Sequence, residues 1–183
     1  MTRIEKIVRC HPAGIVLREK DLPEEEYRTL AKQVMEICGA HGVTCILHTF
    51  VDVALELQAE AIHLPLPVLR SICGKISGAE EKVPDSLKNV TVLGASCHSV
   101  EGAAEAQKLG CTYITAGHVF ATGCKRGLPP RGLDFLDQVC SSVSIPDYSI
   151  GGINAEYMPL VREAGAAGGC FLSGLMQDFP YIS

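Results

Sequence analysis

The chain lacks the features that mark several common classes of protein. Lysine and arginine never form a run, and the formal net charge of the 183 residues is −5, so neither a nucleic acid nor an acidic membrane is expected as a partner. No segment approaches the roughly 18 consecutive apolar residues of a membrane span. The first residues include Arg3 and Glu5, and no apolar signal segment follows them. We therefore expect a soluble protein of the cytoplasm.

The cysteines do not form a recognisable framework either. There are nine of them, an odd number, scattered between Cys10 and Cys170, and none belongs to a C-x-x-C pair. This spacing indicates neither a zinc knuckle nor a set of disulfides. We expect reduced thiols that serve as small core residues.

What is present is the composition of one globular domain. Hydrophobic residues make up 47% of the chain and charged residues 20%, which are ordinary values for a folded protein. No linker or low-complexity segment divides the sequence, so we expect a single domain over residues 1–183.

The order of the expected elements indicates the fold class. An amphipathic helix, a glycine, a short apolar run and a polar loop recur along the chain, which is typical of an α/β protein with a parallel sheet. Continuous apolar runs are expected where parallel strands are buried on both faces. The runs predict seven strands, at residues 14–17, 43–47, 61–64, 90–96, 112–116, 147–150 and 168–172.

Seven strands are one fewer than a TIM-type (β/α)8 barrel contains, and such a barrel typically has about 250 residues. The chain also opens on an expected helix at residues 2–9. We therefore expect a TIM-type (β/α)8 barrel that lacks its first strand and part of its last helix. A neighbouring chain or residues 179–183 would cover the open strand edges, which are costly to expose.

Two glycine-containing turns follow the last two expected strands. Gly151, Gly152 and Ile153 come after one strand, and Ser173 and Gly174 come after the next. Glycines let a backbone approach an anion closely, and phosphate binds at this position in many barrels of this type. We expect a phosphate site there, the alternative being that these glycines only form tight turns.

The long segment 117–132 is rich in glycine, proline and cations, and loops of this length in compact domains are usually functional. His118 directly follows a strand, where an imidazole can act as an acid or a base near neutral pH. The alternative is an incidental loop histidine.

Several motifs together resemble the thiamine-phosphate synthase superfamily. They are GHVFATGCKRGLPPRGLDFL, SIGGIN and FLSGL, preceded by VLREKD, HTFVDVAL and GASCHS. They cover most of the chain in the family's order. The resemblance implies the barrel fold and a small phosphorylated thiazole or pyrimidine as the ligand.

The resemblance also distinguishes two branches. The synthase branch has proline after the loop glycine and holds magnesium through carboxylates, whereas the TenI-type thiazole tautomerase has histidine there and needs no metal. Here His118 occupies that position, and His48-Thr49 replaces the synthase's Asn-Asp. The segment Leu64–Pro67, where the second acidic ligand would fall, contains no carboxylate, and Val16 stands where the synthase has glutamine.

These differences favour a thiazole tautomerase, an isomerase with no metal and no cofactor. His118, expected to be partly accessible at the barrel mouth, would transfer the proton that makes the thiazole aromatic. The resemblance implies that Arg18 or Lys125 binds the substrate carboxylate, while Gly152, Ile153 and Gly174 hold the phosphate. Further binding residues would be Lys20, Ser96, Thr122, Gly151 and Ser173.

Two other functions remain open at this point. One is thiamine-phosphate synthase, a transferase that joins a pyrimidine diphosphate to a thiazole phosphate. The other is a regulator that binds thiazole phosphate without catalysis. His48, at a strand end, is either a second acid–base residue or a structural hydrogen-bonding residue, whereas His63 is taken as incidental. The resemblance also suggests a homodimer.

Overall fold

The computed structural model describes residues 2–74, 87–172 and 175. The strands are β1 Ile15–Leu17, β2 Cys45–His48, β3 Ala61–Pro65, β4 Val92–Cys97, β5 Tyr113–Ala116, β6 Tyr148–Ile150 and β7 Gly168–Cys170. The α-helices are α1 Thr2–Val8, α2 Glu24–Ala40, α3 Val51–Glu56, α4 Leu66–Cys73, α5 Val100–Lys108, α6 Gly132–Ser142 and α7 Met158–Glu163. Short 3-10 helices are η2 Gly123–Lys125 and η3 Ala155–Tyr157.

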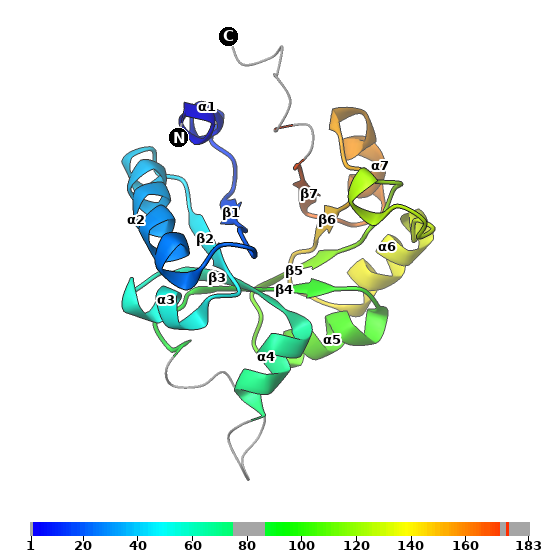
Figure 1. Ribbon diagram of the computed structural model, residues 1–183. Coiled ribbons are helices and arrows are strands. Elements are labelled where there is room, and N and C mark those ends of the chain that lie inside the picture. Colours follow the sequence, from blue (N-terminus) through cyan, green and yellow to red (C-terminus); the bar gives the residue numbers. More distant parts are fainter. Residues whose placement is uncertain (1, 75–86, 173–174, 176–183) are drawn as a thin grey trace.

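The strands form a curled parallel sheet in two parts. The first part has the order β1-β2-β3-β4-β5, and the second pairs β6 with β7. Figure 1 shows helices α2 to α7 in an arc outside the strands, with β1 and β7 facing one another across the open side. The expectation of an incomplete TIM-like barrel is confirmed, and the limits of all seven expected strands lie within two residues of those predicted.

A hydrogen bond from α1 to Leu175 spans the open side of the barrel. The guanidinium of Arg3, on α1, donates a hydrogen bond to the carbonyl oxygen of Leu175 at 3.0 Å. Within the described ranges, β1 and β7 are not paired with each other. Residues 179–183, which were expected to cover these strand edges, lie outside the described residues.

None of the described helices is both long enough and apolar enough to cross a membrane.

Local sequence signals account for most helix boundaries. Pro23 precedes α2, three glutamates occupy its first turn, and its buried side chains are those of Tyr27, Ala31, Val34 and Cys38. These positions recur at helical spacing and pack against the sheet. The side chain of Ser99 accepts a hydrogen bond from the N–H of Gly102 at 3.0 Å, which caps α5 as its sequence predicts.

Two helices differ from their expectation. The sequence analysis assigned no helix to α4, yet Pro67 occupies the first helical turn, where proline is tolerated. The sequence also predicts one helix over residues 154–164, but the structure divides it, with η3 preceding α7. Pro159 explains this, because it lacks the N–H that would continue a helix from the preceding turn.

Apolar side chains form two separate clusters on the two faces of the sheet. The larger cluster lies between the strands and the helices, and it includes Tyr27, Leu47, Ile62, Leu93 and Ile114. The smaller cluster fills the barrel interior and contains Ile46, Ala61, Tyr113, Val92 and Tyr148. Because strand residues alternate between faces, the polar side chains that follow this inner cluster lie near the carboxyl ends of the strands.

The two parts of the sheet are joined through the side chain of Asp147. Backbone hydrogen bonds run from Ile114 N to Pro146 O at 2.9 Å and from Val119 N to Ile150 O at 3.0 Å. Between them, the N–H of Ala116 donates to Oδ1 of Asp147 at 2.8 Å. A carboxylate oxygen thus takes the role of a main-chain acceptor between β5 and β6. Burial of this carboxyl, only 3% exposed, raises its pKa to about 6.

We expect this raised pKa to make stability depend on pH. A carboxyl whose pKa is about 3.9 in the unfolded chain and about 6 in the fold binds more protons when folded between those values. The free energy of unfolding should therefore fall by up to about 3 kcal/mol as the pH rises from 4 to 7. Asp147→Asn, which keeps the acceptor oxygen, should lack this component.

Urea unfolding of the parent and of Asp147→Asn at several pH values measures the difference. Asp134→Asn is the matched control, because Asp134 is an exposed acidic residue in the first turn of α6. Identical pH profiles for the parent and Asp147→Asn would show that the carboxylate contributes nothing to the pH dependence.

Candidate functional site

A hydrogen-bonded cluster of polar side chains crosses the barrel interior below the strand ends. Nδ1 of His63 lies 2.8 Å from the hydroxyl of Tyr113, and its Nε2 lies 2.8 Å from Oγ of Ser96. The ring of His48 stacks on that of His63, with centroids 5.6 Å apart. These residues come from β2, β3, β4 and β5, so four neighbouring strands contribute to one cluster.

Gly94 makes this cluster possible. In the sheet register, Gly94 lies between His63 on β3 and Tyr113 on β5. A Cβ atom on Gly94 would overlap the ring of Tyr113. The missing side chain therefore leaves the space through which the tyrosine hydroxyl reaches His63.

Both imidazoles of the cluster are neutral near pH 7. Burial, and then the positive charge of Arg18, lowers the pKa of His48 to about 4. Burial, and then His48, lowers the pKa of His63 to about 3. Each ring therefore carries one N–H and one acceptor nitrogen, which suits a fixed hydrogen-bonding network.

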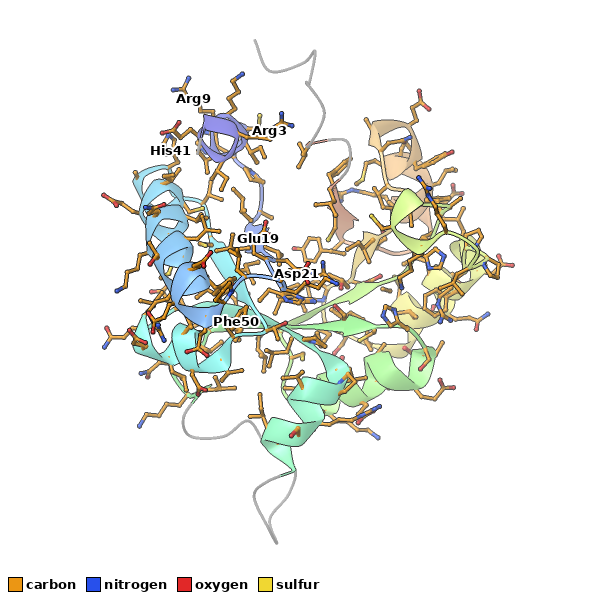
Figure 2. All side chains as sticks on the ribbon, in the orientation of Figure 1. Arg3, Arg9, Glu19, Asp21, His41 and Phe50 are labelled. Carbon is orange, nitrogen blue, oxygen red and sulfur yellow. The ribbon has the colours of Figure 1, made fainter. Side chains whose placement is uncertain are left out.

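The hydroxyl of Tyr27 fixes the neighbouring end of the sheet. It donates to the carbonyl oxygen of Leu17 and accepts from the N–H of His48, both at 2.9 Å. Its ring stacks on that of Phe50, which Figure 2 shows at the start of α3. Burial raises the pKa of Tyr27 to about 12, so the hydroxyl keeps its proton. This side chain holds the carboxyl ends of β1 and β2 together.

The segment after β5 is a closed loop whose two ends are joined. Arg131 N donates to His118 O, and Gly132 N donates to Val119 O, both at 3.0 Å. Inside the loop, Oγ1 of Thr122 accepts from Cys124 N at 3.4 Å at the start of η2. Compact loops with adjoining ends are often functional.

The loop after β6 packs tightly against this segment. Gly151 and Gly152 have φ values of 95° and 69°, a conformation that glycine adopts without strain. A Cβ on Gly151 would overlap His118, and one on Gly152 would lie 2.8 Å from Cβ of Phe120. The Phe120 ring stacks on that of Tyr157 at 4.3 Å. These two glycines therefore join the loops after β5 and β6.

His118 is less accessible than its sequence position suggested. The residue is only 6% exposed, and Gly151 packs closely against its Cα and Cβ atoms. Its Nε2 lies 3.4 Å from the carbonyl oxygen of Leu128. Its Nδ1 is buried and has no hydrogen-bond partner within the described part of the chain, an arrangement that costs about 1–3 kcal/mol. The peptide bond between Gly117 and His118 is cis.

The other expected binding residues lie in different parts of the chain. Arg18 and Lys20 are exposed on the loop after β1, where Figure 2 also shows Glu19 and Asp21, and Nζ of Lys20 lies 4.0 Å from Asp21. Ser96 belongs to the barrel cluster, and Lys125 is half-buried on η2. Ser173 and Gly174 lie outside the described residues.

One member of the cluster was missed by the sequence analysis. His63 was taken as incidental, yet it is 3% exposed and is the central residue of the network. Its place in an otherwise apolar strand was the available signal, because a histidine buried there requires partners. Tyr113 is 50 positions away in sequence, so spacing could not identify that partner.

The residues at the two positions where the resemblance implies metal ligands do not fit magnesium. His48 and Thr49 occupy one position, and Leu64–Pro67 occupies the other, so neither supplies a carboxylate. Magnesium binds oxygen ligands in near-octahedral geometry, usually with one or two carboxylates. Across residues 2–74, 87–172 and 175, no three His, Cys, Asp or Glu side chains are arranged to hold a metal ion.

Fold and site together define an incomplete parallel (β/α) barrel with polar groups collected at the carboxyl ends of its strands. Residues 1–175 match the thiamine monophosphate synthase family. The chain belongs to this family.

Named relatives agree with this assignment. The thiamine-phosphate synthase of Syntrophomonas wolfei is 33% identical over 182 residues, covering 96% of this chain and 80% of its own. Thiamine-phosphate synthase 2 of Streptococcus pneumoniae is 33% identical over 180 residues, with coverage of 97% and 80%. The structure of thiamine phosphate pyrophosphorylase from Pyrococcus furiosus superposes with a TM-score of 0.78 at 26% identity, covering 97% of this chain and 81% of that one.

These relatives correct the functional expectation. The assignments to a thiazole tautomerase of the TenI type, and hence to an isomerase, are wrong, because proteins similar over nearly the whole chain are named synthases. The tautomerase assignment depended too strongly on a single loop residue, His118. His118 was expected to be partly accessible, whereas the residue is only 6% exposed.

We expect the cluster to depend on the space above Gly94. Gly94→Ala should displace the ring of Tyr113, break its hydrogen bond to His63 and lower the free energy of unfolding by about 1–3 kcal/mol, the usual range for overpacking. Gly39→Ala is the control, since nothing lies within 4 Å of a Cβ there, on α2. It should leave stability unchanged or raise it by up to about 1 kcal/mol. Urea titrations measure both, and equal stabilities would refute the steric argument.

Proposed function

We propose that this chain is a thiamine-phosphate synthase, a transferase that joins a pyrimidine diphosphate to a thiazole phosphate. The observation that carries the proposal is the 33% identity to proteins of that name over 96–97% of the chain. In the reaction, a bond forms between the thiazole nitrogen and the pyrimidine methylene carbon. The bond from that carbon to the diphosphate oxygen breaks, and diphosphate leaves.

The arrangement of charges supports two phosphorylated substrates. Arg18 and Lys20 follow β1 and are exposed, and Lys125 is half-buried on the loop after β5. Cations at these strand ends suit diphosphate oxygens. On the other side, the N–H groups of Gly152 and Ile153 donate to no acceptor within the described part of the chain. They are therefore proposed to hold the phosphate of the thiazole, together with Gly151, Ser173 and Gly174.

His118 takes a binding role in this proposal. Its buried Nδ1 has no partner among the residues that the structure describes, and such a group is stabilised when a ligand atom or a bound water supplies the missing hydrogen bond. We propose that the thiazole phosphate supplies it, directly or through water, with Thr122 orienting the surrounding loop. Ser96, already bonded to His63, would contact the pyrimidine.

The test is product formation from the two substrates. The purified chain is incubated with pyrimidine diphosphate and thiazole phosphate, and thiamine phosphate is separated by chromatography after oxidation to its fluorescent thiochrome. Product above the no-enzyme control is expected, and light scattering on the same sample tests the expected homodimer. If the chain binds thiazole phosphate and forms no product, it is a binding protein and the proposed activity is wrong.

His118→Leu separates a binding role from a structural one. Removing an unsatisfied buried nitrogen should leave the stability unchanged or raise it by about 1 kcal/mol. The same change should lower kcat/KM for the thiazole phosphate by about 3- to 10-fold, the range for one lost neutral hydrogen bond. Thermal unfolding and initial rates measure the two effects. Unchanged kinetics in a folded variant would remove His118 from the site.

A further inference from the structure

The turn between β2 and α3 holds a threonine in an unusual conformation. Thr49 has a φ of 70°, a value at which a β-branched residue is a genuine outlier and which costs on the order of a few-fold to a hundred-fold in local population. Backbone hydrogen bonds maintain it, from Thr49 N to His63 O at 3.1 Å and from Phe50 N to His48 O at 2.9 Å. Strain of this kind concentrates at functional sites.

The side chain of Thr49 is bonded to the preceding residue. Its Oγ1 lies 2.6 Å from Nδ1 of His48. The ring of His48 also stacks on that of His63. One nitrogen of His48 is therefore occupied and the ring plane is fixed. Within the described ranges, no protein atom is hydrogen-bonded to its Nε2.

The contact with Thr49 is compatible with either tautomer of His48. The ring is neutral near pH 7 and carries a single N–H. In the tautomer in which the threonine hydroxyl donates to Nδ1, the ring proton lies on Nε2, which then acts as a donor. Leu17 pairs with Leu47, so Arg18 and His48 are neighbours at the ends of β1 and β2, where His48 is 8% exposed and Arg18 is exposed.

We propose that His48 Nε2–H and the Arg18 guanidinium bind a phosphoryl group of the substrate directly, without magnesium, and that Thr49 is the positioning residue that sets the proton on Nε2. The identity of the anion as a diphosphate rests on the proposed function. The observation that carries the inference is the donor set itself. The resemblance implies a metal-ligand position at His48-Thr49, and these residues offer a donor and no carboxylate.

Calorimetric titration with inorganic pyrophosphate tests the metal dependence. Pyrophosphate should bind the parent chain with a similar Kd, within about 3-fold, in excess EDTA and in excess magnesium. Loss of binding in EDTA, or no binding in either buffer, would overturn the inference.

Variants of His48 test the donor. His48→Gln retains an amide N–H at a comparable distance from the backbone and should bind nearly as the parent does. His48→Leu should weaken binding about 10-fold, as expected for a lost hydrogen bond to a charged group. His41→Leu is the control, because Figure 2 shows His41 at the far end of α2. Parental affinity in folded His48→Leu would refute the role of the donor.

Variants of Thr49 test the positioning role and protect against a folding artefact. Glycine adopts a φ of 70° freely, so Thr49→Gly should fold while losing the hydroxyl, and Thr49→Ser keeps the hydroxyl. Binding should weaken several-fold in Thr49→Gly and be retained in Thr49→Ser. Nitrogen-15 spectra should show the His48 proton on Nε2 in the parent and in Thr49→Ser, and shared between both nitrogens in Thr49→Gly. A proton on Nδ1 in the parent would contradict the proposal.

The outcomes for the inference and for the proposed function are distinguishable. A chain that forms thiamine phosphate only with magnesium would be a synthase in which this inference is wrong. A chain that binds pyrophosphate in EDTA through His48 and forms no product would keep the inference and lose the proposed function.

Discussion

The carboxylate of Asp147 is the contact on which the arrangement of the site depends. It accepts the N–H of Ala116 between two backbone hydrogen bonds and so joins the two-stranded part of the sheet to the five-stranded part. The cations and imidazoles lie on the five-stranded part, whereas Gly151 and Gly152 follow β6. This side chain therefore helps to set the spacing between the loops after β5 and β6, together with the backbone hydrogen bonds of Ile114 and Val119. Its burial is unfavourable for the charged form, which is the physical cost of that joint.

The interior of the barrel is polar without being charged. Both histidines of the cluster are neutral, and burial raises the pKa of Tyr113 well above its usual value. The charged groups, Arg18 and Lys20, stay in solvent at the rim. Neutral donors and acceptors can be satisfied inside a small barrel, whereas an isolated buried charge could not. This separation leaves positive charge at the rim and a network of neutral hydrogen-bonding groups in the interior.

Sequence patterns predicted the fold well because its signals are local. Apolar runs located the seven strands, and Ser99 located the start of α5. The helix α4 was missed because a proline in a first turn resembles a turn signal. The His63–Tyr113 contact was missed for a different reason, since it joins residues 50 positions apart across Gly94. The accessibility of His118 depended on where Gly151 packs, which a linear pattern does not contain.

The buried acid also affects the chemistry of the thiols. Burial first, and then the negative charge of Asp147, raises the pKa of Cys97, Cys140 and Cys170 to about 12, so these sulfurs remain thiols at neutral pH. Alkylating reagents attack the thiolate. Of the nine cysteines, only Cys10 and Cys124 are exposed. A maleimide dye applied to the folded chain would therefore attach at these two positions, and Cys124 lies on η2 in the loop after β5. The native sequence thus carries an attachment point for a fluorescent reporter on the loop that contains His118 and Thr122, the residues proposed to take part in binding the thiazole phosphate.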